Sequence, residues 1–314
     1  MALDLVSYQK RLAHRAGGTA TNVASNLAFL GWKASIAGLI GDDPASHAMI
    51  WDLTRAKVDV TALELRSDVD TPLVLHEIYD TGHRFRFSCP SCGRRFPKYR
   101  PLSENAASAL CETLAVPSVF FFDRANAGTA RLAEFFRERG ALIVFEPSTQ
   151  GREPERCVQV AHVVKYSSAR AAAVAPLLKD VSPVLQLVTT GADGIEGSLR
   201  GKAFRVSGFR AAVVDSAGAG DWTTAGFLWA LTSLDPNDWK KALVVEALRQ
   251  AQALAAVSCA FPGARAVSEH LTRDQMISVA RRLLEEQVPA ARDVELGNDT
   301  PAVPGSCPAC LTAS

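Results

Sequence analysis

The chain has 314 residues, of which 48% are hydrophobic, and its 34 basic and 33 acidic side chains leave a formal net charge of +1. A chain of this size can form two domains, or one α/β domain with an insertion. The balanced charge gives no general attraction to nucleic acid or to an anionic membrane, so neither is expected as a partner. No apolar run reaches the roughly 18 residues that span a bilayer, and the first residues lack the pattern of a signal peptide, so a cytoplasmic location is expected.

The first part of the chain predicts a helix, a strand and a hairpin. Residues 21–30 have the spacing of a helix that ends at a glycine, and the apolar run at 34–40 predicts a buried strand. Residues 73–87 indicate two strands around a short turn, which is a hairpin rather than a strand–helix unit. Because such a hairpin would project from a parallel sheet, we expect it to form a lid at about residues 70–100.

The middle of the chain alternates short apolar strands with helices. The predicted strands are 119–122, 142–145, 162–165 and 184–188, and the predicted helices lie near 127–139 and 168–178. This alternation is typical of a parallel sheet covered by helices on both faces. From about residue 219 the sequence predicts helices almost throughout. Its composition after about residue 289 is that of a tail with little intrinsic structure, so the predicted organisation is a domain over 1–288 and a tail over 289–314.

The start of the chain lacks a feature that doubly wound sheets usually have. Asp4 comes only a few residues into the sequence, and no apolar strand precedes it. We therefore expect that a short native strand lies upstream of the sequence.

The strongest chemical signal lies around Asp221. A strand is predicted to end at Asp215 and a helix to begin near Ala219, and the small residues Gly218, Ala219 and Gly220 leave backbone N–H groups bare. Bare N–H groups at a helix N-terminus bind phosphate. A carboxylate at Asp221 would lie beside that phosphate and could accept a proton from an attacking hydroxyl. An ordinary glycine-rich turn, with Asp221 favoured by the helix dipole, explains the same residues.

Two motifs about 200 residues apart resemble the signatures of the ribokinase-like (PfkB) carbohydrate kinases. Gly-Gly-Thr-Ala-Thr-Asn-Val-Ala at 17–24, with Gly-Leu-Ile-Gly-Asp-Asp at 38–43, resembles the N-terminal signature. Asp-Ser-Ala-Gly-Ala-Gly-Asp at 215–221 resembles the C-terminal one. The resemblance covers about residues 2–285. It implies a three-layer α/β/α sheet with a small β lid, and a kinase that uses ATP and Mg²⁺ to phosphorylate a hydroxyl of a sugar or nucleoside.

The resemblance also implies roles for single residues. Asp221 would be the general base, and the anion hole would be formed by Gly218, Ala219 and Gly220. Substrate hydroxyls would be held by Asp4, Gly17, Gly18 and Asn22. The residues implied for the cofactor site are Thr189, Gly191, Gly194, Asp215 and Gly263. Plainer explanations stay open, because a glycine pair can form a tight turn, an asparagine can cap a helix, and an acid near a terminus can simply be solvated.

One expected motif is missing. The family often has Asn-x-x-Glu after the strand at 162–165, where the glutamate orders the magnesium shell, but this chain has Lys-Tyr-Ser-Ser-Ala-Arg at 165–170. Glu146-Pro-Ser stands where Asp-Pro-Asn is common. We therefore expect that magnesium handling differs or that activity is low. The alternative function is a catalytically degenerate binding or regulatory protein with a structural zinc site.

The cysteines add a pattern that the family does not usually have. Cys89-Pro-Ser-Cys92 and Cys307-Pro-Ala-Cys310 each resemble a zinc knuckle. One structural Zn²⁺ held by all four thiolates would attach the tail to the base of the lid. The alternative is that they are free or redox-active thiols. A homodimer formed through the lid is a further expectation.

Overall fold

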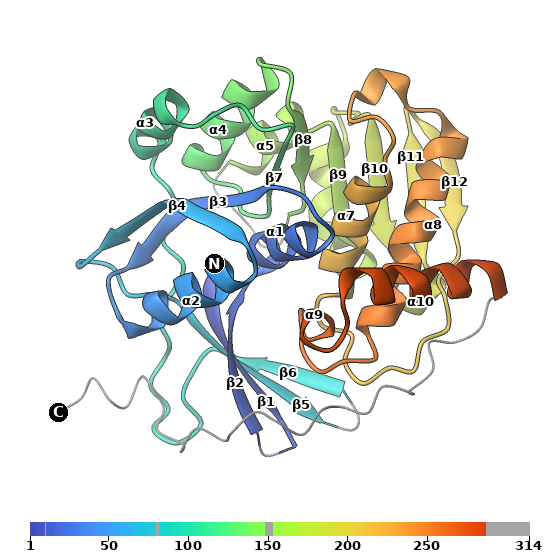
Figure 1. Cartoon of the computed structure of the whole chain (residues 1–314). Coiled ribbons are helices and arrows are strands. Elements are labelled where there is room, and N and C mark those ends of the chain that lie inside the picture. Colours follow the sequence, from blue (N-terminus) through green and yellow to red (C-terminus); the bar gives the residue numbers. More distant parts are fainter. Residues whose placement is uncertain (10, 80–81, 148–152, 287–314) are drawn as a thin grey trace. The chain divides into compact units, whose positions relative to one another are not determined.

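The computed structural model describes residues 1–9, 11–79, 82–147 and 153–286 (Figure 1). The chain divides into two compact units, each built from separate stretches of sequence. The first unit contains 1–100, 211–225 and the described residues from 254 onward; the second contains 101–210 and 226–253. No helix in the described part of the chain is long and apolar enough to cross a membrane.

The first unit contains a four-stranded sheet in the order β2-β1-β5-β6. Strands β1 (Ala2–Tyr8) and β2 (Arg11–Gly17) form an antiparallel hairpin. Strand β5 (Leu73–Tyr79) pairs parallel to β1 and antiparallel to β6 (Gly82–Arg86). The hairpin predicted from residues 73–87 is thus confirmed, but it is half of a larger sheet that also includes the first strands of the chain.

A second, two-stranded sheet completes the strands of this unit. Strands β3 (Ala34–Gly41) and β4 (Val58–Arg66) run parallel, and helix α2 (Pro44–Arg55) connects them. Helix α1 (Thr19–Phe29) precedes β3, so the predicted helix and strand are both confirmed. A core of buried apolar side chains joins these elements to the four-stranded sheet, and it includes Leu3, Leu5, Ile40, Met49 and Leu53.

The second unit contains a six-stranded sheet in the order β12-β11-β10-β9-β8-β7. The parallel strands are β7 (Val119–Phe122), β8 (Leu142–Phe145), β9 (Val163–Ser167) and β10 (Leu185–Thr189). All four were predicted. The sheet ends in the antiparallel strands β11 (Ile195–Leu199) and β12 (Lys202–Val206), which the sequence alone did not reveal.

Helices cover the six-stranded sheet. Helices α3 (Glu104–Thr113), α4 (Ala127–Arg137) and α5 (Pro154–Val160) share an apolar core with its strands. The single helix predicted near 168–178 is instead α6 (Ala171–Val174) between two 3₁₀ turns. Pro176 lies in the second turn, where its missing N–H prevents an α-helix from continuing.

The last described residues are mainly helical, as predicted. The helices are α7 (Ala219–Ala230), α8 (Lys241–Ser258), α9 (Val267–His270) and α10 (Arg273–Glu286). The prediction of a strand that ends at Asp215 is wrong. The amides of Val214 and Asp215 both donate to the carbonyl of Cys259, at 2.8 and 3.1 Å, so one acceptor anchors this segment where a strand would have a ladder.

Candidate active site

Helix α7 begins directly after a glycine that no other residue could replace without strain. Gly218 has φ +79°, and a Cβ atom there would lie 2.4 Å from Cβ of Ala264. The fully buried Trp222 donates from Nε1 to the carbonyl of Ala264 at 3.1 Å. The close approach and this hydrogen bond together fix the start of α7 against the segment around Ala264.

The first turn of α7 carries the predicted base. Asp221 is buried, and its Oδ2 accepts a hydrogen bond of 2.6 Å from Nδ2 of Asn22 on α1. The structure therefore brings together two predicted site residues that lie 199 positions apart. Gly18, not Asn22, occupies the N-cap position of α1, so helix capping does not explain the asparagine. Its amide instead orients the Asp221 carboxylate.

The predicted anion hole coincides with the N-terminus of α7. Amides of a first helical turn have no intrahelical acceptor, and the helix dipole gives them partial positive charge. Gly218 and Gly220 contribute no side chain that could block their approach to an anion. The amide of Ala219 already donates to the carbonyl of Ser216 at 3.2 Å, so an anion at this residue would compete with an internal acceptor.

The glycine pair packs against Asp4. A Cβ atom on Gly17 would lie 1.9 Å from Oδ2 of Asp4, and Gly18 has φ +94°. Asp4 lies in β1 and is partly buried, and this burial raises its pKa from the usual 3.8 to about 7, although Arg265 and the N-terminal amine oppose the shift. Near neutral pH the carboxyl group is therefore able both to donate and to accept a hydrogen bond, which suits a substrate hydroxyl.

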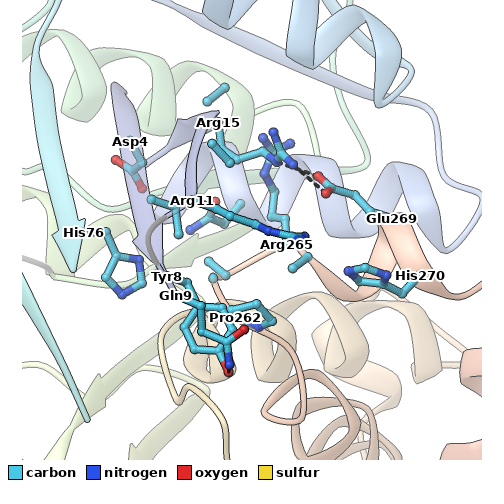
Figure 2. Close-up of a pocket in the computed structure, with 17 residues that line it drawn as sticks. Asp4, Tyr8, Gln9, Arg11, Arg15, His76, Pro262, Arg265, Glu269 and His270 are labelled. Atoms are coloured by element: carbon cyan, nitrogen blue, oxygen red, sulfur yellow. Dashed lines mark hydrogen bonds and ion pairs between the residues drawn. The ribbon is translucent and has the colours of Figure 1, made fainter. Parts of the chain in front are cut away.

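Asp4 and Asn22 line one pocket within the first unit. Its wall also contains Arg11, Arg265 and His76 (Figure 2). Further along the wall, Arg15 forms an ion pair with Glu269, with Nε and Oε1 2.5 Å apart, as the dashed lines in Figure 2 show. The sequence motifs identified the aspartate and the asparagine, but not the arginines or His76.

A buried ion pair fixes one side of this pocket. Arg265 donates to the carboxylate of Asp52 and, at 2.8 Å, to Oγ of Ser25. The same carboxylate accepts a hydrogen bond of 2.7 Å from the amide of Ala16, just before the glycine pair. Arg265 and Asp52 are 213 positions apart, and no local pattern marks either of them.

Asp215 and Gly263, both predicted for the cofactor site, are in direct contact. The amide of Gly263, a residue with φ +96°, donates to Oδ2 of the buried Asp215 at 2.9 Å. The amide of Ala217 donates to Oδ1 at 2.9 Å. Their role in holding a nucleotide or its counter-ions stays a prediction.

The other predicted nucleotide-site residues form one turn in the second unit. Thr189 is the last residue of β10, and Gly191 opens the 3₁₀ turn that follows it. Gly194 has φ +106°, and a Cβ atom there would lie 2.1 Å from the carbonyl oxygen of Val206. The amide and hydroxyl of Thr190 both donate to the carbonyl of Gly194, at 2.9 and 3.0 Å. The turn is well defined, and its binding of a nucleotide stays a prediction.

The second unit also contains the two positions where the motif departs from the family. Glu146 follows β8 and Lys165 lies in β9, and Nζ of the lysine is 2.5 Å from Oε1 of the glutamate. Both side chains are buried. The carboxylate that stands where the family commonly has Asp-Pro-Asn therefore has an internal cation, Lys165, as its partner.

Only the first cysteine pair can be placed. Cys89 is buried and Cys92 is exposed, and the turn between them is closed by two backbone hydrogen bonds, from Cys89 to Arg94 and from Gly93 to Cys89, each 2.9 Å long. Cys307 and Cys310 lie outside the described residues, as does the predicted tail. The four-cysteine zinc site stays a prediction.

The parallel sheet with its helices, the small mixed sheet and the glycine-lined start of α7 beside a buried carboxylate define a ribokinase-like small-molecule kinase. Residues 2–271 match the model of the pfkB family of carbohydrate kinases, and the chain belongs to this family. The family assignment and the fold class predicted from the two motifs are thereby confirmed.

Individual relatives are similar along most of their length. The chain is 28% identical to a fructokinase of Klebsiella pneumoniae over 81% of this chain and 89% of the relative. It is 26% identical to an aminoimidazole riboside kinase of Salmonella typhimurium, over 79% and 83% of the two chains. The solved aminoimidazole riboside kinase of Salmonella enterica superposes with a TM-score of 0.69 at 22% identity, over 89% of this chain and 97% of that one.

Proposed function

We propose that the protein transfers the γ-phosphoryl group of ATP to a hydroxyl of a sugar or nucleoside, with Asp221 as the general base. The observation that carries this proposal is the hydrogen bond between Asn22 and Asp221 at the start of α7. It brings the N-terminal and C-terminal motifs together at one helix N-terminus. A buried, oriented carboxylate next to partly positive amides is the arrangement that phosphoryl transfer to a hydroxyl requires.

Each residue of this site has a distinct task in the proposed reaction. Asp221 accepts the proton of the attacking hydroxyl, and Asn22 holds the carboxylate in position. The amides at Gly218–Gly220 stabilise the charge that develops on the transferred phosphoryl group. Asp4, with its raised pKa, holds another hydroxyl of the acceptor. The turn at Thr189–Gly194 is the proposed contact for the nucleotide.

Magnesium normally neutralises phosphate charge in such reactions. The Asn-x-x-Glu motif expected to order its shell is missing from residues 165–170. Lys165, in that stretch, instead forms a buried ion pair with the carboxylate of Glu146. We therefore assign no protein ligand to magnesium and derive no step through it.

The named relatives support the class of acceptor. They include fructokinases, which act on a sugar, and an aminoimidazole riboside kinase, which acts on a riboside. Both kinds of acceptor present hydroxyl groups to a pocket that contains Asp4 and Asn22. A homodimer formed through the lid remains a further prediction, to be checked by light scattering.

A coupled assay of ADP formation tests the proposal. Purified protein is supplied with ATP, Mg²⁺ and one member of a panel of sugars and nucleosides, including fructose, ribose and aminoimidazole riboside. We expect ADP formation that depends on at least one acceptor and is absent in the acceptor-free control. ATP binding measured by calorimetry without turnover on any acceptor would instead support the degenerate, regulatory alternative.

A further inference from the structure

Three side chains of the kinds that commonly bind metals, none of them a cysteine, meet in the first unit. His76 lies on β5, His83 on β6, and Asp215 precedes α7. Their ligand atoms all lie within 4.8 Å of one another, and they are the one such group of three found among the described residues. Nδ1 of His83 is 2.8 Å from Oδ1 of Asp215, and Nε2 of His76 is 3.5 Å from Oδ2.

The histidine–aspartate contacts leave one buried atom unsatisfied. Only 2% of His76 is exposed, and its Nε2 has no hydrogen-bond partner within the part of the chain that the structure describes. Burial lowers the pKa of His76, as does the neighbouring His83, whereas Asp215 opposes the shift. Phe85 stacks on the imidazole with ring centroids 4.5 Å apart, which fixes its plane. A buried imidazole with an unsatisfied nitrogen needs a partner, and the described residues do not supply one.

The carboxylate of this cluster is already held in place. The amides of Ala217 and Gly263 donate to its two oxygens, both at 2.9 Å. Hydrogen bonds of this kind orient the first ligands of metal sites and tune their basicity. Asp215 is buried, so a bound cation would also compensate a charge that water does not reach.

We propose that His76, His83 and Asp215 form a binding site for a divalent transition-metal ion of the Zn²⁺ class. Two imidazole nitrogens and one carboxylate favour such an ion over Mg²⁺ or Ca²⁺, which prefer oxygen ligands. Metal–ligand bonds of about 2.0–2.2 Å place tetrahedral ligands about 3.3–3.5 Å apart, so small side-chain shifts from the present separations suffice. Three protein ligands leave a fourth position for water or another small ligand. Binding requires neutral imidazoles, so any proton on the metal-binding nitrogens passes to solvent.

The ion would tie the β5–β6 hairpin to the segment that leads into α7. In the antiparallel pair β5–β6, His76 lies opposite Phe85 and His83 lies opposite Ile78. The two histidines are therefore diagonal neighbours on adjacent strands, which brings them close together. Asp215 reaches the same point from a segment more than 130 positions further along the sequence. This site shares no ligand with the four-cysteine site predicted from sequence, so the two can be separated by mutation.

The test is a titration of metal-stripped, full-length protein with Zn²⁺ by calorimetry and with Co²⁺ by visible absorption. His83→Gln is the main variant, because His83 is half-buried rather than fully buried and its replacement is less disruptive than His76→Gln. His47→Gln is the matched control, since this exposed histidine contacts Asp42 on the surface. Cys92→Ser with Cys307→Ser removes thiolate ligands from any zinc bound by the cysteines. Circular dichroism checks that each variant is folded.

We expect Zn²⁺ binding to be retained in the cysteine-substituted protein and in His47→Gln. In His83→Gln the Zn²⁺ affinity should fall by at least about 10-fold. The Co²⁺ complex should show d–d bands without thiolate charge transfer in the cysteine-substituted protein. The proposal is wrong if the cysteine-substituted protein binds no Zn²⁺, or if folded His83→Gln binds it as tightly as the parent. If His76→Gln folds, its Zn²⁺ affinity must fall in the same way as that of His83→Gln.

Discussion

The start of α7 and the end of β8 are two places where family resemblance leads one to expect catalytic groups, and the chain treats them differently. At α7 the expected glycines, Asn22 and Asp221 are present and in contact. After β9 the expected metal-shell motif is missing, and Lys165, which lies in that stretch, forms a buried pair with Glu146 at the end of β8. The proton-accepting site is thus kept as the motif describes it, whereas the carboxylate near the expected magnesium shell serves an internal ion pair.

The largest expected effect is at the α7 site. Asp221→Asn keeps the shape of the side chain but cannot accept the proton, so kcat should fall by at least about 10²-fold while ATP affinity, measured by calorimetry, is nearly unchanged. Asp274→Asn is the matched control, because it removes an exposed acid from the first turn of another helix, α10. Near-normal turnover of Asp221→Asn would remove this residue from the mechanism.

Breaking the ion pair at the end of β8 should lower the free energy of unfolding. Lys165→Met leaves the charge of Glu146 buried without its cation, and removing one partner of a buried pair costs about 3–5 kcal/mol. Arg249→Met, which breaks an exposed pair with Glu246, should cost about 0–1 kcal/mol. Urea unfolding measures both. If Lys165→Met is as stable as the Arg249 variant, the buried pair does not stabilise this region.

The conformation before α7 is open to a finer test. Gly218→Val combines an unfavourable positive φ with a clash against Ala264, so it should destabilise the protein by several kcal/mol and reduce turnover. Gly140→Val introduces the same side chain at φ +89° where no atom lies within 4 Å. The difference between the unfolding free energies of the two variants measures the cost of the clash with Ala264. If both variants lose the same free energy of unfolding, the positive φ alone accounts for the effect.

The last expected effect is the pH dependence of stability that Asp4 contributes. Because its pKa is about 7 in the folded protein and 3.8 ordinarily, the folded state retains the proton that the unfolded state loses. Asp4 therefore destabilises the fold progressively as pH rises from about 4 to about 7, and by a constant amount above that. Asp4→Asn should gain stability relative to the parent across this window. The urea midpoints of the parent and of Asp4→Asn are compared from pH 4 to pH 8. A constant difference between the two midpoints over this range would contradict the raised pKa of Asp4.

The sequence predicted the elements whose patterns are local. The four parallel strands and the start of α7 follow from apolar runs and small residues that are contiguous in sequence. The hairpin β1–β2 was missed because Leu3 and Leu5 alternate with Asp4 and half-buried side chains, which leaves no apolar run. The strand predicted before α7 was wrong because its apolar residues are anchored by a single carbonyl, of Cys259, and not by a neighbouring strand.

Much of the candidate site depends on contacts that no local pattern encodes. The pair of Arg265 with Asp52 joins residues 213 positions apart, and that of Arg15 with Glu269 joins residues 254 apart. The motif pointed to Asp215 but gave no reason to connect it with His76 and His83. Such residues become visible only when the fold brings the strands and the segment before α7 together.

The central claim, that the contact between Asn22 and Asp221 marks a working phosphoryl-transfer site, is tested most directly by identifying the product. Phosphorus NMR of wild-type protein with ATP, Mg²⁺ and the acceptor found in the panel should show a phosphomonoester on that acceptor. Asp221→Asn at equal ATP occupancy should form it at least about 10²-fold more slowly. ATP that binds but yields no phosphorylated acceptor, or a product formed equally fast by both proteins, would contradict the account.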